Sequence, residues 1–384
     1  MAKYILEDLK EKMVFIGGAR QVGKTTLARK LIAPHFSSNA YFNWDFRADR
    51  QKVLNDVLPG DAELLMFDEI HKYKQWKNYM KGIYDAYKEK YCFLVTGSAR
   101  LNIYRKGGDS LQGRYHYYTL HPFTLAEMMK LRNDLKPFEE IDIRQGNYTD
   151  DYISLKYYGG FPEVLLKQND QALRRWHHEK LERLFREDVR DLESVRDIGN
   201  MKLLGDILPG KVGSLLSINS IREDLMVSHR AITNWLSILE LFYYHFRIAP
   251  YHTNKIRSIK KEPKLYLYDW SEIEDDSARF ENMIASHLLK LVQFYQDHEG
   301  LDCQLNFLRN VDRKEVDFLV SVKNKPWFCV EAKLNETTPS SGIFYFRDRL
   351  EIPFCYQVIN KSNIDLLRDN VRIISADRFL ASLL

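Results

Sequence analysis

The sequence of 384 residues has little cysteine, no long apolar run and no internal repeat. Its four cysteines stand at positions 92, 303, 329 and 355 without CxxC spacing, and three of them lie in apolar stretches. This pattern argues against a disulfide framework or a zinc site and predicts reduced thiols in the core. No apolar run reaches the ~18 residues of a membrane span, and the N-terminus lacks the apolar segment of a signal peptide. We therefore expect a cytoplasmic protein that does not bind membranes.

The chain also has no large excess of positive or negative charge. The formal net charge is +4 and the sequence pI is near 8.6, which permits nucleic-acid binding but lies below the strongly basic range that would argue for it. Hydrophobic residues make up 45% and charged residues 29% of the chain, as in globular proteins. The length suggests two or three domains with sizeable cores.

Short apolar runs alternate with amphipathic stretches over the first third of the chain, which predicts a parallel α/β sheet with helices on both faces. The runs expected to form strands are 13–19, 40–46, 63–69 and 91–97. The pattern then becomes helical and strongly charged. A helix expected over 277–295 precedes short strand-like runs that continue to the end.

The segment GGARQVGKTTLARKL has the spacing of a phosphate-binding loop, and an apolar run and a helix-forming run flank it. Glycines let backbone N–H groups close around phosphate oxygens, and the helix start favours anions. We expect Lys24 to reach the β- and γ-phosphates of ATP and the Thr25 hydroxyl to bind Mg²⁺. The expected nucleotide-binding residues are Gly18, Ala19, Arg20, Gln21, Val22, Gly23, Lys24, Thr25 and Thr26. The alternative is a glycine-rich turn.

Two further runs end in polar residues. In LLMFDE, Asp68 would complete the Mg²⁺ shell and Glu69 would polarise the attacking water; the alternative is a strand that simply ends in acids. In FLVTGSAR, the Ser98 hydroxyl would touch the γ-phosphate or the water; the alternative is a turn residue.

The segments GARQVGKTTLARKL, LLMFDEIHK, VTGSAR, LQGRYHYYTLHPFTLAEM and YYGGFPEVLL follow one another in this order. In them the chain resembles a family of prokaryotic AAA+ ATPases with a C-terminal domain of unknown function. The resemblance extends over nearly the whole chain. It implies an AAA+ core, a helical and winged-helix middle, and a nuclease-like C-terminal domain. It also implies a homo-oligomer, such as a hexameric ring, in which one subunit's arginine enters the next subunit's site.

Arg114, in QGRYH, is the candidate for that arginine by its place in the motif order. It would act on charge that develops in the transition state. Arg100 and Arg105 are rivals, and the alternative for Arg114 is a surface arginine.

Residues 217–248 show the pattern of a helix, a short turn, a second helix and a strand, with Ser217 and Ser228 as N-caps. This is a helix-turn-helix pattern, and the resemblance implies a winged helix. The polar residues at the start of the second helix, where nucleic-acid contacts are made, are His229, Arg230, Thr233 and Asn234. The alternative is a module that binds protein or acts as a lid.

The stretch KEVDFLVSVKNKPWFCVEAK predicts two strands joined by a turn. Strand alternation allows a hairpin to bring Asp317 near Glu331, with Lys333 on the same face. Two carboxylates can hold Mg²⁺, and a lysine can orient water or phosphate. Glu281 on the preceding helix would complete the order of the PD-(D/E)xK nuclease signature.

The alternative is a charged strand face that is solvated or paired in a salt bridge. Glu-x-Lys occurs a second time at residues 262–264, where Pro263 argues against a central strand.

Together these features predict an ATP-hydrolysing protein, with Mg²⁺ as cofactor, that acts on or is recruited to nucleic acid, DNA preferred. The alternative is a nucleotide-switched regulatory or scaffold ATPase whose accessory domains bind protein. The expected domains are 1–130, AAA+ and ATP-binding; 131–200, helical lid or linker; 201–262, winged-helix-like; and 263–384, α/β and restriction-endonuclease-like.

Overall fold

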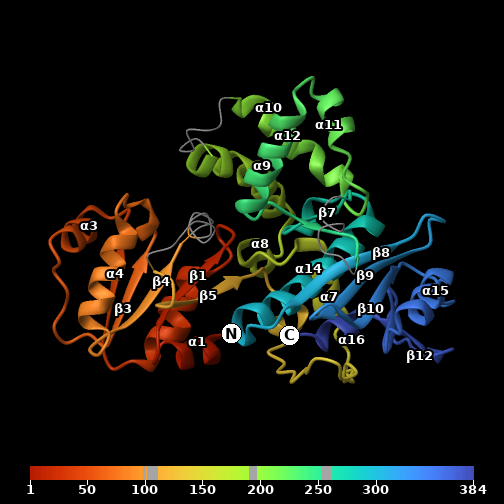
Figure 1. Ribbon diagram of the computed structural model, residues 1–384, viewed down its shortest axis with the longest axis horizontal. Coiled ribbons are helices and arrows are strands. Elements are labelled where there is room, and N and C mark those ends of the chain that lie inside the picture. The colour runs from red at the N-terminus through yellow and green to blue at the C-terminus, as the bar shows by residue number, and fades with distance from the viewer. Residues whose placement is uncertain (98–100, 102–110, 190–196, 253–260) are drawn as a thin grey trace. The chain divides into compact units, whose positions relative to one another are not determined.

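The computed structural model describes residues 1–97, 101, 111–189, 197–252 and 261–384 (Figure 1). The chain divides into two units. The first contains Met1–His121 and Leu241–Tyr243, and the second contains Pro122–Glu240 and Tyr244–Leu384. Among the described helices, none combines the length and the apolar composition that crossing a bilayer requires.

A parallel sheet forms the centre of the first unit. Within the described residues it has five strands in the order β2-β3-β4-β1-β5, and all neighbouring pairs are parallel. The strands are β1 (Met13–Gly18), β2 (Asn39–Asn43), β3 (Leu64–Asp68), β4 (Cys92–Thr96) and β5 (Tyr115–Leu120). The first four match the expected apolar runs. β1, β3 and β4 are buried along nearly their whole length, and strands buried on both faces need continuous apolar sequence. The pattern of apolar runs does not predict β5, because its sequence YHYYTL lacks an aliphatic run.

Helices cover both faces of this sheet (Figure 1). The side chains of Phe15 and Phe67 belong to the core cluster beneath α3 and α4, whereas those of Val14 and Ile16 belong to the cluster beneath α1 and η1. Neighbouring residues of β1 thus enter different cores, as strand alternation requires. The helical segments are α1 (Ala2–Asp8), α2 (Lys24–Thr26), the π-helical η1 (Leu27–Ile32), η2 (Ala33–His35), α3 (Arg47–Leu54), η3 (Ile70–Lys72) and α4 (Trp76–Tyr87). The predicted α/β class of this region is confirmed.

The second unit begins with a helical region. Its segments are α6 (Leu125–Met128), α7 (Thr149–Tyr158), α8 (Pro162–Lys167), α9 (Asp170–Arg183), η5 (Leu184–Val189), α10 (Ile198–Ile207), η6 (Leu208–Lys211), α11 (Ile218–Asp224) and α12 (His229–Leu241). The predicted helix-turn-helix corresponds to α11 and α12. The Ser217 hydroxyl accepts the N–H of Ser220 at 3.4 Å, and the Ser228 hydroxyl accepts the N–H of Ala231 at 3.1 Å. Both predicted N-caps are therefore confirmed.

A two-stranded antiparallel sheet follows, formed by β6 (His245–Ile248) and β7 (Lys264–Leu267). The long helix α14 (Asp276–Glu299) holds β7 through side chains. The Asn282 amide donates to the carbonyl of Leu267 and accepts its N–H, both at 2.7 Å. The Tyr266 hydroxyl donates to Glu281 Oε1 at 2.7 Å. The strand pair is thus fixed to α14.

A mixed sheet completes the second unit. The described residues give it six strands in the order β12-β13-β11-β10-β9-β8, in which β10, β11 and β13 run parallel. The strands are β8 (Cys303–Arg309), β9 (Glu315–Val322), β10 (Lys325–Lys333), β11 (Phe354–Ile359), β12 (Asp365–Arg368) and β13 (Val371–Ser375). Lys323 and Asn324 connect β9 to β10 with φ of 50° and 62°, as a two-residue hairpin turn requires. The predicted hairpin is confirmed.

Helices also pack on this sheet (Figure 1). The remaining helical segments are η7 (Trp270–Glu272), α15 (Ser341–Leu350) and α16 (Ala376–Ala381). Ile343 of α15 packs in one cluster with Leu319 and Cys329, and Phe379 of α16 contacts Tyr356 of β11. All four cysteines, which lie among the described residues, are free thiols as predicted.

Candidate functional site

The predicted phosphate-binding loop follows β1 at the carboxyl edge of the first unit's sheet. Gly18 (φ 144°) and Gly23 (φ 104°) have positive φ, a backbone conformation that residues with a side chain rarely adopt. The buried Lys24 ammonium donates to the carbonyl oxygens of Gly18 at 3.0 Å and Ala19 at 2.7 Å. The loop therefore encloses one positive charge.

Close packing against β5 adds a second reason for glycine at this point. A Cβ atom at Gly17 would lie 1.6 Å from the Tyr117 hydroxyl oxygen, and one at Gly18 would lie 2.4 Å from the Leu120 carbonyl oxygen. Real Cβ atoms do not approach that closely. The loop therefore begins where β1 and β5 are in tight contact, a constraint that the motif alone does not reveal.

Asp68, the last residue of β3, accepts hydrogen bonds from three hydroxyl groups. Its Oδ2 accepts from Thr25 at 3.0 Å and from Tyr41 at 2.6 Å, and its Oδ1 accepts from Thr96 at 2.7 Å. Burial, together with the bond to Asp68, raises the pKa of Tyr41, so this phenol remains a donor. Sequence reasoning predicted Thr25 and Asp68 but missed Tyr41 and Thr96. A polar residue at the end of the apolar run that forms β4 was the available signal for Thr96.

Glu69 follows Asp68 with a left-handed backbone, φ 58°. Burial raises the pKa of the Glu69 carboxyl group, and the neighbouring Lys72 opposes that shift. Glu69 Oε2 lies 3.5 Å from both His71 Nε2 and Lys72 Nζ. A mostly desolvated carboxylate accepts a proton more readily than a solvated one. The environment of Glu69 is therefore suited to a general base.

The donor set at this sheet edge fits ATP with Mg²⁺. The Thr25 hydroxyl and the Asp68 carboxylate are hard oxygen ligands 3.0 Å apart, of the kind that Mg²⁺ prefers. Lys24 and the backbone N–H groups of the loop would hold the phosphates. Bound Mg²⁺ would supply neutralisation of phosphate charge.

The candidate residues for the γ-phosphate fall in two groups. Ser98, Arg100 and Arg105 lie outside the described residues. Arg114 makes a two-nitrogen contact with Asp85 of α4, with Nε to Oδ1 at 2.7 Å and Nη2 to Oδ2 at 3.0 Å. Its guanidinium group therefore has a partner within its own unit.

Arg114 also lies at the edge of the sheet opposite to the phosphate-binding loop. Arg114 directly precedes β5. Gly18 pairs with Leu120 at the other end of β5, six residues after Arg114. At ~3.3 Å per residue this is roughly 20 Å. Arg114 therefore cannot reach the phosphate site of its own chain.

The four polar residues predicted for nucleic-acid contact are exposed at the start of α12. The Thr233 hydroxyl donates to the His229 carbonyl at 2.9 Å. In the described part of the chain, no hydrogen bond or ion pair holds the side chain of Arg230 or Asn234. Both side chains are thus available to a ligand.

A cleft of about 490 Å³ adjoins the start of α12. Its lining combines cationic and acidic side chains from α11, α12 and the β6–β7 region, and includes Asn219, His229, Glu240, Arg247, Lys261 and Glu262. Arg247 is already paired with Glu240. The cleft is therefore polar and of mixed charge.

The hairpin brings the predicted carboxylates of the second unit together. The Asp317 N–H donates to Glu331 Oε2 at 3.4 Å, and Asp317 Oδ2 accepts the N–H of Ala332 at 3.0 Å. Lys333 Nζ lies 3.0 Å from Glu331 Oε1. Glu281 of α14 joins this cluster because one lysine contacts both Glu281 and Asp317.

That lysine is Lys264, the first residue of β7. Its Nζ lies 2.6 Å from Glu315 Oε1 and 3.3 Å from both Glu281 Oε1 and Asp317 Oδ1. Burial disfavours the ammonium charge, but the carboxylates outweigh burial and raise the pKa of Lys264. Pro263 precedes the strand instead of interrupting it. The second Glu-x-Lys thus does not lie in a central strand, since β7 pairs with β6 in a sheet that has two strands among the described residues, but its lysine enters the acidic cluster, which the sequence did not indicate.

As arranged, this cluster does not fit a divalent metal ion. Lys264 contacts an oxygen of three carboxylates, and Lys333 contacts the fourth, Glu331. Across the described ranges, no group of three or more His, Cys, Asp or Glu side chains is positioned to hold a metal ion. The metal role predicted for Glu281, Asp317 and Glu331 therefore has no support from their geometry.

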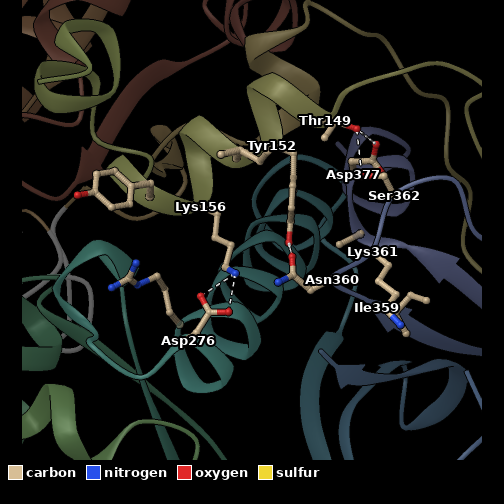
Figure 2. A pocket seen from close by; sticks show the side chains of 13 residues that line it. Thr149, Tyr152, Lys156, Asp276, Ile359, Asn360, Lys361, Ser362 and Asp377 are labelled. Carbon is tan, nitrogen blue, oxygen red and sulfur yellow. Dashed lines mark hydrogen bonds and ion pairs between the residues drawn. The ribbon is translucent and has the colours of Figure 1, made fainter. Parts of the chain in front are cut away.

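A pocket of about 350 Å³ lies elsewhere in the second unit, between α7, the start of α14, the end of β11 and the start of α16. Figure 2 shows Lys156 of α7 pointing to Asp276, with Nζ 2.7 Å from Oδ1, and Tyr152 pointing to Asn360. Thr149 donates to Asp377 Oδ2 at 3.3 Å. Pairs across the pocket wall thus connect the helical region to the α/β domain. No sequence motif indicated it, because its lining comes from separated segments.

Three segments of the chain match family models. Residues 10–129 match a model described as an AAA domain, residues 149–271 match a domain of unknown function (DUF8612), and residues 277–379 match another (DUF4143). The first segment contains the phosphate-binding loop, Asp68 and Glu69 at the edge of a parallel sheet. It is therefore an AAA-type P-loop domain, and the predicted AAA+ fold is confirmed.

Two proteins of one archaeal organism are similar to this chain in sequence. The chain is 26% identical over 376 residues to uncharacterized protein MJ1544 of Methanocaldococcus jannaschii, a match that covers 89% of this chain and 80% of that one. It is 26% identical over 297 residues to uncharacterized protein MJ1637 of the same organism, covering 67% of this chain and 61% of that one.

Among solved structures, the similarities are slight. The Aeropyrum pernix ORC1 protein in complex with DNA is 12% identical with a TM-score of 0.29, and the match covers 75% of this chain and 91% of that one. A RuvB variant of Thermotoga maritima is 17% identical with a TM-score of 0.32, and the match covers 64% of this chain and 87% of that one.

Proposed function

We propose that this protein hydrolyses ATP with Mg²⁺ and uses the ATP cycle to act on nucleic acid, with DNA as the preferred form. The observation that carries the proposal is the 3.0 Å contact of Thr25 with Asp68 beside the enclosed Lys24. In this proposal Lys24 holds phosphate, and Thr25 and Asp68 hold the metal ion. Glu69 accepts a proton from the attacking water.

The nucleic-acid part of the proposal rests on α12. Its first two turns expose His229, Arg230, Thr233 and Asn234. The strands β6 and β7, which follow it in the chain, would serve as the wing. In a helix-turn-helix protein the start of the second helix enters the major groove. The guanidinium group of Arg230 is suited to phosphate or to a guanine edge.

Assembly of several copies belongs to the same proposal. Arg114 lies at the sheet edge away from the loop of its own chain, so any contact it makes with a γ-phosphate must be in a neighbouring copy. A closed ring of identical subunits, such as a hexamer, would give every site one such arginine.

The test measures binding of duplex DNA by fluorescence anisotropy at several salt concentrations, with and without ATP. Arg230→Ala should weaken binding and make its log–log salt dependence shallower by about one unit, since one phosphate contact is lost. Arg175→Ala, which removes an exposed arginine from α9, is the matched control and should leave the slope unchanged. ATP turnover should rise when DNA is added.

A second function is favoured by one observation. Met226, in the turn between α11 and α12, is 93% exposed, and exposed methionine suits a protein contact. Here the protein would be a nucleotide-switched regulatory or scaffold ATPase. Absence of DNA or RNA binding at low salt, with and without ATP, would favour this function over the first.

A further inference from the structure

The acidic cluster of the second unit consists of Glu281, Glu315, Asp317 and Glu331, and Lys264 lies inside it. We propose that Lys264 takes the place that a divalent metal would have in a nuclease, and that the cluster is a joint that fixes the β6–β7 strand pair to the α/β domain. This inference is independent of whether the chain hydrolyses ATP or binds DNA.

The position of the Lys264 ammonium supports the substitution. It contacts one oxygen each of Glu281, Glu315 and Asp317 at 3.3, 2.6 and 3.3 Å, and its side chain is 4% exposed. A metal ion bound between these carboxylates would need the space that the Lys264 ammonium group fills. It would also neutralise carboxylate charge that the ammonium group already neutralises. Like charges this close need a cation between them, and the chain itself provides one.

Further donors of this chain bind the carboxylates of the cluster. Glu281 Oε1 accepts from Tyr266, Glu315 Oε2 from Arg309 at 3.0 Å and Asp317 Oδ2 from a backbone N–H. Both oxygens of Glu331 have partners, Lys333 and the Asp317 N–H. Seven of the eight carboxylate oxygens therefore have a donor from this chain. Three cations, Lys264, Lys333 and Arg309, face the four acids.

The mechanical role follows from which elements supply the partners. Lys264 and Tyr266 are two residues apart on β7 and so project from the same side of the strand, toward Glu281 of α14. Asn282 of α14 binds both backbone groups of Leu267. The ion cluster and the amide contact together hold β7, and with it β6, in one position against α14.

Binding of Mn²⁺ to the full chain without nucleotide tests the first half of the inference. The free Mn²⁺ signal in electron paramagnetic resonance is followed for the wild type, for Asp317→Asn and for Asp68→Asn, which reports the nucleotide site. We expect Asp317→Asn to bind as much Mn²⁺ as the wild type. A site in the wild type that Asp317→Asn loses and Asp68→Asn keeps would overturn the inference. So would Mn²⁺-dependent DNA cleavage that Asp317→Asn abolishes.

Substitution of the internal cation tests the second half. Lys264→Met should lower the melting temperature by several degrees, and Mn²⁺ should raise the melting temperature of this variant more than that of the wild type. Lys333→Met, which removes a half-exposed lysine with one carboxylate partner, should have a smaller effect. Unchanged stability of Lys264→Met would overturn the role as a joint.

If Lys264→Met does not fold, a second variant that also removes the unneutralised carboxylate charges tests the same idea. Lys264→Met combined with Glu315→Gln and Glu281→Gln removes one positive and two negative charges, and it should recover a folded chain without any response to Mn²⁺. Failure of this triple variant to fold under conditions in which Lys333→Met folds would contradict the electrostatic origin of the effect.

Discussion

Single residues at the carboxyl ends of β1, β3 and β4 define the nucleotide site. Lys24 and Thr25 begin α2 after β1, and Asp68 ends β3. The parallel strands place both segments at one edge of the sheet. Asp68 then collects three hydroxyl donors. These three bonds fix the orientation of a buried carboxylate.

Substitutions of Lys24 and Glu69 should separate binding from turnover. Lys24→Ala should abolish ATP binding, since the enclosed ammonium is lost. Glu69→Gln should bind ATP with wild-type affinity and hydrolyse it at least ~100-fold more slowly, because the amide cannot accept the proton. Calorimetry and phosphate release measure the two properties. Wild-type turnover in Glu69→Gln would show that another group is the base.

Tyr41 and Thr96 should act by positioning Asp68. Tyr41→Phe and Thr96→Val each remove one donor to the carboxylate and should raise the Mg²⁺ concentration needed for half-maximal turnover roughly three- to tenfold, about 1 kcal/mol per bond. Tyr73→Phe is the control, since that hydroxyl contacts Gln75 and not Asp68. An unchanged Mg²⁺ requirement in both variants would rule out the positioning role.

At the scale of elements, α14 connects several parts of the second unit. One turn binds β7 through Glu281 and Asn282, and a later turn binds α6 through His287. The His287 Nδ1 lies 2.7 Å from the carbonyl oxygen of Met283, and Nε2 accepts the N–H of Leu125 at 3.2 Å. A neutral imidazole with its proton on Nδ1 satisfies both partners, whereas a second proton on Nε2 would face an N–H group.

Acid should therefore destabilise the second unit. Burial lowers the pKa of His287 to about 4, and burial lowers the pKa of His245 to about 4 as well. An unfolded histidine titrates near 6.5. Between these values the unfolded chain binds the proton and the folded chain does not. The stabilisation is fully present above pH ~6.5 and is lost as the pH falls toward 4, by up to about 1.4 kcal/mol per pH unit for each histidine.

Urea unfolding from pH 7.5 to pH 5 measures this effect. His287→Gln should be less stable than the wild type at pH 7.5 and should lose less stability on acidification. His178→Gln removes an exposed histidine of α9 and should retain the wild-type pH dependence. Equal pH slopes for wild type and His287→Gln would contradict the assignment of this proton.

At the scale of the whole molecule, each unit has its own core, and the AAA-type domain holds a nucleotide site whose predicted arginine lies at the far edge of the same sheet. Arg114 pairs with Asp85 at that edge. A trans role requires the guanidinium group to exchange this partner for a phosphate of the neighbouring copy.

Arg114→Ala should bind ATP normally, hydrolyse it poorly, and reduce the turnover of wild type when the two are mixed, because mixed assemblies contain incomplete sites. Asp85→Asn is the matched control: it breaks the same ion pair and leaves the arginine in place, so its turnover should stay near the wild-type value. Equal losses in Arg114→Ala and Asp85→Asn would mean that the pair is structural. Specific turnover that is independent of protein concentration would also argue against trans action.

Prediction from sequence was strongest where chemistry and structure are local. The spacing of Gly18, Gly23, Lys24 and Thr25 predicts a phosphate loop because a handful of adjacent residues make it, and capping by Ser217 involves a neighbour three residues away. Strands β1 to β4 were predicted from continuous apolar runs. β5 was missed because its aromatic and polar residues are buried by neighbours that the local pattern does not reveal.

By itself, the sequence determined the loop that can hold phosphate, the two acids at the end of β3, the N-caps of α11 and α12, and the β9–β10 hairpin, since each depends on residues close together in the chain. Only the tertiary structure decided which distant groups meet. It brought Tyr41 and Thr96 to Asp68, and it placed Lys264 among carboxylates from α14 and β9. The meeting of Asp317 with Glu331 was predictable from strand alternation. Glu315 was not predicted, and the cation Lys264 was not predicted either, because Lys264 lies 53 residues from Asp317 in the chain.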